Sequence, residues 1–142
     1  MPVDDYGWVM RTVAAAIGVA VLAGWAAPAA SAETAVLPER PGYQGVVFAD
    51  NPAIVDAHPM RAESFSRSED DRVIAVHFTT GTPQCYGVHA TVQETPDVVT
   101  VALRGGTLPE AVGRACIMIA VSGTLDIALQ HPLGARQVLT AF

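Results

Sequence analysis

The two cysteines are the first residues of this chain that could do chemistry. Cys85 stands in "GTPQCYGVHATVQ" and Cys116 in "GRACIMIA", and the 142 residues contain no other cysteine. They could be two reactive thiols, two metal ligands or one disulfide. Zinc sites usually bring cysteines in closely spaced C-x-x-C pairs, which are missing here. An even number of cysteines in an exported chain usually pairs, so we predict a Cys85–Cys116 disulfide if the chain is exported.

Four histidines are the next candidates. His58 and His131 each precede a proline in a turn-like stretch and are expected on the surface. His77 and His89 fall on the outward face of two neighbouring strand patterns, and a hairpin through "TTGTPQCYG" would bring them together. Such a pair could hold a ligand or metal, or sense pH. Two imidazoles are fewer ligands than a zinc site needs, so an exposed pair without a function is the alternative.

Other catalytic motifs are missing from the sequence. The acidic run Glu69–Asp71 lacks the spacing of a calcium loop, and there is no G-x-S-x-G elbow, P-loop or G-x-G-x-x-G motif. We also expect no acidic residue at a core-facing strand position, where burial would raise its pKa. The formal net charge of −6 argues against nucleic-acid binding. The sequence therefore predicts no catalytic residue, no cofactor and no metal.

The N-terminal stretch is typical of a secretory leader. "RTVAAAIGVAVLAGWAAPAASA" ends with Ala30 and Ala32 in the A-x-A pattern of signal peptidase, which predicts cleavage after Ala32. A start at Met10 would give a better formed leader, because residues 1–9 carry two aspartates. A retained transmembrane anchor is the alternative. We thus expect a secreted or envelope protein that meets the membrane only through this segment, before cleavage.

The elements that would position these residues are strands. Residues 33–60 carry several prolines and read as an extended arm with turns, and residues 61–142 read as an antiparallel β domain. We expect an all-β fold with one disulfide, preceded by a helical signal segment. It would be an antiparallel meander of about five to seven strands curled into a small sandwich or barrel. The expected strands carry alternating apolar residues, and they include 72–80, 85–93, 98–104, a long one over 116–129 with a bulge or bend at Gly123, and 137–141.

One hairpin has a definite expected register. If "ETPD" is its four-residue loop, Gln93 faces Val98 and Val92 faces Val99. The apolar side chains then collect on one face and the threonines on the other, as an antiparallel ladder with one buried face requires. In the preceding strand, Ile74, Val76 and Phe78 are expected to point inward.

Four short motifs resemble a group of small exported or lipid-anchored proteins of high-GC Gram-positive (actinobacterial) bacteria with no established activity. They are "CYGV" (85–88), "VQETPDVVTV" (92–101), "ACIMIA" (115–120) and "PLGAR" (132–136), within a similarity of about 80 of the 142 residues. The resemblance implies export, paired cysteines and a compact β domain, and it carries over no catalytic residue. The chain lacks the lipobox cysteine of the anchored members, so we expect it to be released or held by the wall.

The function expected from these observations is non-catalytic binding. The partner would be an envelope protein or a wall component, and nucleic acid is not expected. Two alternatives stay open: a carrier of lipid or another small ligand, with a cavity inside the β shell, and a small hydrolase with an unrecognised site. The hydrolase would need a cleft that joins His77 or His89 to a carboxylate.

Overall fold

The computed structural model describes residues 31–142, and these form an all-β domain. The all-β prediction is confirmed, whereas the expected helical leader, including Ala30, lies outside the described residues. Ala32 is exposed and precedes the first strand. The nine strands and one 3-10 turn of residues 31–142 are β1 (Thr34–Val36), β2 (Val46–Phe48), β3 (Val55–Met60), β4 (Ser64–Arg67), β5 (Val73–Thr80), β6 (Tyr86–Glu94), β7 (Val98–Thr107), η1 (Pro109–Ala111), β8 (Val121–Ala128) and β9 (Gln137–Ala141).

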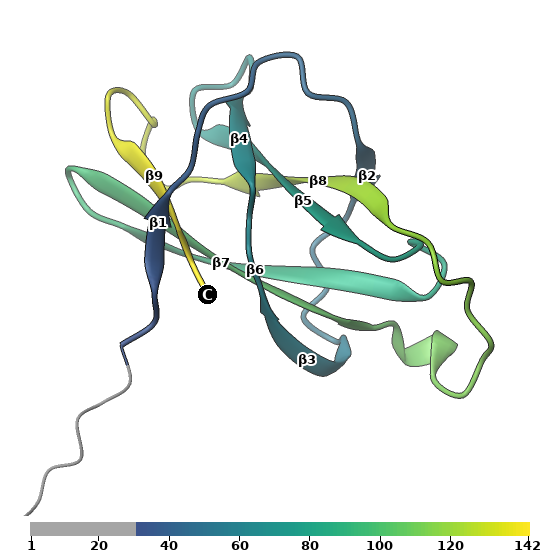
Figure 1. The fold of residues 1–142 in the computed structure, drawn as a ribbon. Coiled ribbons are helices and arrows are strands. Elements are labelled where there is room, and N and C mark those ends of the chain that lie inside the picture. The colour runs from purple at the N-terminus through teal and green to yellow at the C-terminus, as the bar shows by residue number, and fades with distance from the viewer. Residues whose placement is uncertain (1–30) are drawn as a thin grey trace, which may run out of the picture. The chain divides into compact units, whose positions relative to one another are not determined.

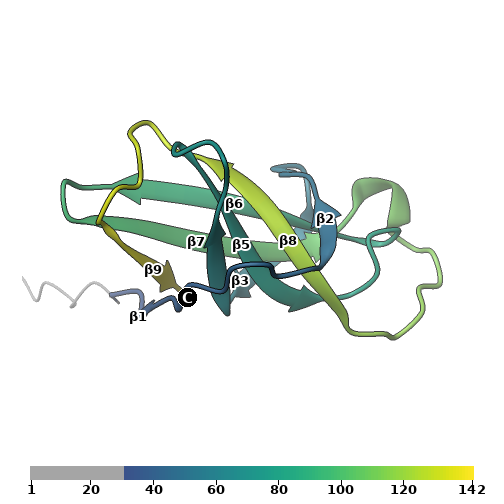
Figure 2. The same cartoon turned by 90° about the horizontal axis from the view of Figure 1, so that it is seen from above.

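The strands form two mixed sheets that together make a half-barrel. The first sheet contains β1, β9, β7, β3 and β6, and the second runs β2-β8-β5-β4. The strands of one sheet cross those of the other (Figures 1 and 2). The predicted antiparallel meander is wrong, because β2 pairs with β8 in parallel and β7 pairs with β9 in parallel. The parallel β7–β9 pair arises because the chain leaves the first sheet after β7, forms β8 in the second, and then returns.

The segment 33–60 differs from the expected arm, because it supplies strands to both sheets. β1 pairs with β9, β2 pairs with β8, and β3 pairs with β7. Leu37 and Phe48 of this segment are buried in the core. Burial of these apolar side chains explains why a proline-rich stretch folds against the domain instead of extending into solvent.

Strand β7 is shared by three partners. β6 runs along one edge, while β9 pairs with Val98–Ala102 and β3 pairs with the remainder of β7. The β3–β7 register shifts between Val55 and His58, which marks a β-bulge. Within this bulge Asp56 has a φ of 53°, a left-handed conformation that aspartate tolerates better than most residues. The bulge shifts the register of β3 against β7 by one residue, beginning with His58.

The core between the sheets follows the expected alternation. Ile74, Val76 and Phe78 are fully buried, as predicted, and they belong to one core cluster with buried residues of β7 and β8. Gly123 does not mark the expected bulge, since the β5–β8 register is continuous through it. A Cβ at Gly123 would lie 2.6 Å from the Phe78 ring and 2.9 Å from the Phe48 ring. Glycine stands there because the two aromatic rings fill the space.

The β6–β7 hairpin forms, but its predicted register is wrong by two residues. Val92 faces Val101 instead of Val99, because Thr95 donates a 2.8 Å backbone hydrogen bond to Val98 and leaves only two residues at the tip. A shift of two keeps every side chain on its predicted face. The tighter turn also extends β6 to Glu94, which therefore occupies the core-facing row.

Candidate functional site

The cysteines form a disulfide, as predicted. The two sulfur atoms of Cys85 and Cys116 are 2.02 Å apart and the Cα atoms 6.2 Å apart. Cys85 is buried immediately before β6, whereas Cys116 lies in the loop between η1 and β8. The bond therefore ties that loop to the start of β6. Neither cysteine remains free as a nucleophile or metal ligand.

The segment that follows Cys116 is exposed and apolar. The long strand expected over 116–129 is wrong in its first part, because β8 begins only at Val121, opposite the last residue of β5. No strand lies opposite residues 117–120, which form none of the backbone hydrogen bonds that hold the other loops. Ile117, Met118 and Ile119 are 60, 91 and 50% exposed. Figure 1 shows this stretch in the green coil between β7 and β8.

A groove runs beside this apolar segment. It has a volume of about 430 Å³, and the end of β5 and Tyr86 form its other side. The sequence offered one signal for the exposure: three consecutive apolar residues cannot all face one side of a strand. The run is predicted as strand because it continues directly into the alternating apolar residues that form β8.

His77 is buried, which corrects the expectation that it lies on an exposed face. Its parity is outward from the core, but Tyr43 stacks on the imidazole with ring centroids 3.8 Å apart. Ser64 Oγ lies 2.8 Å from Nδ1 and Ser66 Oγ 3.1 Å from Nε2. Burial lowers the pKa of His77, and the charge of Arg40 lowers it further. The lowered pKa favours the neutral imidazole, which lies between two serine hydroxyl groups with the Tyr43 ring stacked on one face.

His89 lies in the other sheet, so the two histidines do not form the expected pair. β5 pairs with β4 and β8, whereas β6 pairs with β7, and the loop between β5 and β6 crosses from one sheet to the other. The Nδ1 of His89 lies 2.9 Å from an oxygen of Asp50. Among residues 31–142, His77 is therefore buried and bonds to serine hydroxyl groups but to no carboxylate. His89 bonds to the carboxylate of Asp50 but to no hydroxyl group.

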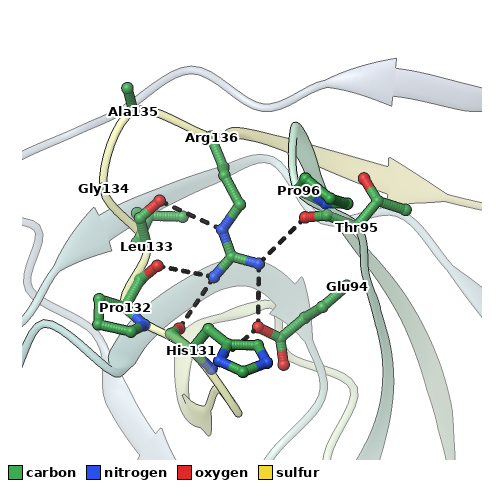
Figure 3. Close-up of a pocket in the computed structure, with 9 residues that line it drawn as sticks. All are labelled: Glu94, Thr95, Pro96, His131, Pro132, Leu133, Gly134, Ala135 and Arg136. Atoms are coloured by element: carbon green, nitrogen blue, oxygen red, sulfur yellow. Dashed lines mark hydrogen bonds and ion pairs between the residues drawn. The ribbon is translucent and has the colours of Figure 1, made fainter.

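A pocket of about 460 Å³ lies between the β6–β7 turn and the loop before β9 (Figure 3). Arg136 stands at its centre and forms an ion pair with Glu94, the Nη1 to Oε1 distance being 3.0 Å. The two side chains are only 9 and 11% exposed. All five N–H groups of the guanidinium have acceptors inside the chain, namely Glu94 Oε1 and the carbonyl oxygens of Thr95, His131, Pro132 and Leu133.

Glu94 completes the network from the other side. Its carboxylate also accepts hydrogen bonds from the backbone N–H groups of Gln130 and His131. Burial acts to raise the pKa of Glu94, but these backbone donors and Arg136 outweigh it and lower the pKa. The expectation that no acidic residue lies in a core-facing row is therefore wrong. The predicted four-residue turn includes Glu94, whereas the observed tighter turn leaves Glu94 on β6, opposite Val99.

The hydrogen bonds of Arg136 determine whether the pocket can bind an anion. A guanidinium binds an anionic ligand through free N–H donors, and Arg136 has none to offer. His131 contributes its backbone N–H and carbonyl to the network. The polar residues of the pocket thus act as a clamp that joins the β6–β7 turn to the loop before β9.

Comparisons with known proteins add no assignment to these sites. No family model, no curated protein and no solved structure matches the chain. Within residues 31–142, no cluster of three or more His, Cys, Asp or Glu side chains could hold a metal ion. The same residues contain no helix with the length and apolarity to span a membrane.

Proposed function

We propose that this chain is an exported, non-catalytic binding domain that recognises an envelope protein through Ile117, Met118 and Ile119. The observation that carries the proposal is the exposure of three consecutive apolar side chains beside a groove. Contiguous exposed apolar surface is typical of protein interaction sites. An apolar segment suits a protein partner better than a hydrated wall polysaccharide.

The disulfide supports the same proposal. It anchors the loop one residue before Ile117, so the apolar segment is held at the surface without belonging to a sheet. Its backbone is free to pair with an extended segment of a partner, which is a common way to extend a sheet. A held segment loses less conformational entropy on binding than a free loop does.

Two other functions receive less support from the side chains. A hydrolase needs an accessible nucleophile, a base and an orienting group in contact, and neither His77 nor His89 is part of such a set. A carrier needs an internal cavity, whereas the space between the sheets is filled by residues such as Phe48, Phe78 and Leu125. Binding through the surface is favoured over both.

Export is tested by the intact mass of the protein recovered from the culture medium. We expect a chain that begins at Glu33 and takes up no alkylating reagent until it is reduced. The disulfide supports export because such bonds persist in oxidising compartments. Recovery of the full-length chain from the cytoplasm alone would contradict this part of the proposal.

Binding is tested with the triple variant Ile117→Ser/Met118→Ser/Ile119→Ser. These side chains are exposed, so we expect the melting temperature to stay unchanged. Immobilised wild-type protein should retain a specific protein from a native envelope extract, and the triple variant should lose it. In the complex, peroxide should oxidise Met118 at least about tenfold more slowly, because a partner that covers the segment excludes the reagent.

Val36→Ser is the matched control. Val36 is as exposed as Ile117 but belongs to β1, away from the loop after η1. This variant should retain the same protein as the wild type. The proposal fails if the triple variant binds as well as the wild type, or if Met118 oxidises equally fast in the complex.

A further inference from the structure

His58 and Met60 lie on the same side of β3, and both line a pocket to which the end of β5 also contributes. His58 is opposite Gly105 and Met60 is opposite Leu103 on β7. Gly105 is in turn opposite Val88, and both Val88 and Leu103 belong to the core. The imidazole and the thioether therefore lie on the core side of an edge strand, where His58 stays exposed and Met60 is half-buried.

The hydrogen bonding of His58 defines which nitrogen is free. Its Nδ1 lies 3.3 Å from the backbone oxygen of Asp56, and an oxygen of this kind only accepts. Nδ1 therefore carries the proton, and in the neutral ring Nε2 has a free lone pair. Asp56 is the bulge residue with positive φ, so the bulge places this carbonyl beside the ring. A backbone carbonyl on one ring nitrogen is the usual support of a metal-binding histidine.

The free nitrogen and the sulfur converge above Gly105. The position that a Cβ on Gly105 would take lies 2.5 Å from Met60 Sδ and 3.6 Å from His58 Nε2. Any other residue at position 105 would place its Cβ in this space. The two atoms line a pocket of about 290 Å³, to which Thr79, Thr80 and Tyr86 also contribute. The pocket is thus open to a small solute and carries one soft donor, the thioether sulfur, and one imidazole nitrogen on the same wall.

We propose that His58 Nε2 and Met60 Sδ bind a soft monovalent cation, Cu(I), above Gly105. Thioether sulfur selects Cu(I) among the common ions, and imidazole is also a good copper ligand. Zn²⁺ is disfavoured, because it takes four ligands and this pocket offers two. His58 and Met60 do not line the groove beside segment 117–119, although Thr79, Thr80 and Tyr86 line both spaces. The two ligands are residues that the proposed function does not use, so the proposal does not depend on it.

Ag⁺ is the probe, because it is soft, monovalent and needs no reductant that could open the disulfide. Protein labelled with ¹³C at the methionine methyl groups is titrated with silver nitrate in a chloride-free buffer. One equivalent of Ag⁺ should shift the Met60 methyl signal and the Hε1 signal of His58. Cu(I), added under argon as its acetonitrile complex, should produce the same pattern. An equivalent of Zn²⁺ should leave the Met60 signal in place.

Single variants test each ligand. His58→Ala and Met60→Leu should each weaken Ag⁺ binding at least about tenfold, the scale at which losing even a supporting group affects a metal site. Met118→Leu and His131→Ala are the matched controls, since each removes a donor of the same type elsewhere, and they should bind as the wild type does. A melting curve of each variant confirms that it is folded.

Three results would overturn the proposal. They are the absence of a Met60 shift at one equivalent, a response confined to Met118, and unchanged Ag⁺ affinity in folded His58→Ala protein. We expect the triple serine variant to lose partner retention and to keep its Ag⁺ binding. This result would show that the two sites act independently.

Discussion

Removal of the Cys85–Cys116 disulfide is expected to lower the free energy of unfolding by about 3 to 4 kcal/mol. The bond closes a loop of 31 residues that contains β6, β7 and η1. Cutting it restores conformational freedom mainly to the unfolded chain, which is the state that the crosslink restricts. Urea unfolding of the wild type and of Cys85→Ser/Cys116→Ser, at equal pH and salt, measures the difference.

Reductant provides the control for this experiment. It should shift the wild-type urea midpoint toward that of the double serine variant, and it should leave the double variant unchanged. A loss below about 1 kcal/mol would contradict this expectation, because the crosslink would then restrict the unfolded chain far less than its loop length implies.

Loss of Glu94 is expected to cost about 3 kcal/mol, because it leaves the charge of Arg136 buried without its partner. The pair is almost inaccessible to solvent, and its carboxylate also satisfies two backbone N–H groups. Glu94→Ala should therefore unfold at a clearly lower urea concentration. Glu39→Ala is the matched control, since the Glu39–Arg67 pair is 39 and 46% exposed and should contribute less than about 1 kcal/mol.

The same carboxylate should make stability depend on pH. The pKa of Glu94 in the folded protein lies below its ordinary value of 4.5, so the unfolded chain takes up a proton first as pH falls. Its stabilisation is complete above about pH 4.5 and is lost as pH decreases toward the folded pKa. Melting temperatures between pH 3 and 7 should fall less steeply below pH 4.5 in Glu94→Gln than in the wild type. Parallel curves would contradict the assignment.

His77 contributes at higher pH in the same direction. Burial and Arg40 lower its pKa below 6.5, so the unfolded chain again binds the proton first. Stability from this residue is present above about pH 6.5 and is lost as pH falls from there. The Glu94→Gln comparison separates the two groups, because the variant keeps the His77 part of the profile.

Alternation along the chain was enough to assign the faces of most strands. Ile74, Val76 and Phe78, the apolar residues of β6 and β7, and Leu125, Ile127 and Leu129 all face the side that the sequence predicts. The hairpin register was wrong by two, yet the faces were right, since the side-chain period is two residues. The disulfide followed from the number of cysteines and the leader-like N-terminus.

The choice of strand partners could not be read in this way. A strand pattern is local, and it is the same whether the neighbour is sequential or comes from the other end of the chain. β5 and β6 look like a hairpin but belong to different sheets, which separates His77 from His89. The pairing of β9 with β7 places Arg136 beside Glu94. Glu94, which the sequence placed in a turn, therefore forms a buried ion pair with Arg136.

Exposure was likewise a property of the assembled domain. His77 has the outward parity of a solvent-facing residue, yet it is buried, with Tyr43 stacked on its ring. Ile117, Met118 and Ile119 have the composition of a core strand and are exposed because β5 ends opposite Val121. Residue type and spacing therefore settled the all-β class, the inward faces and the crosslink. Long-range strand pairing decided which sheet each strand joins, which side chains are buried, and which groups surround each polar side chain. In this pairing each strand competes for partners across the whole chain.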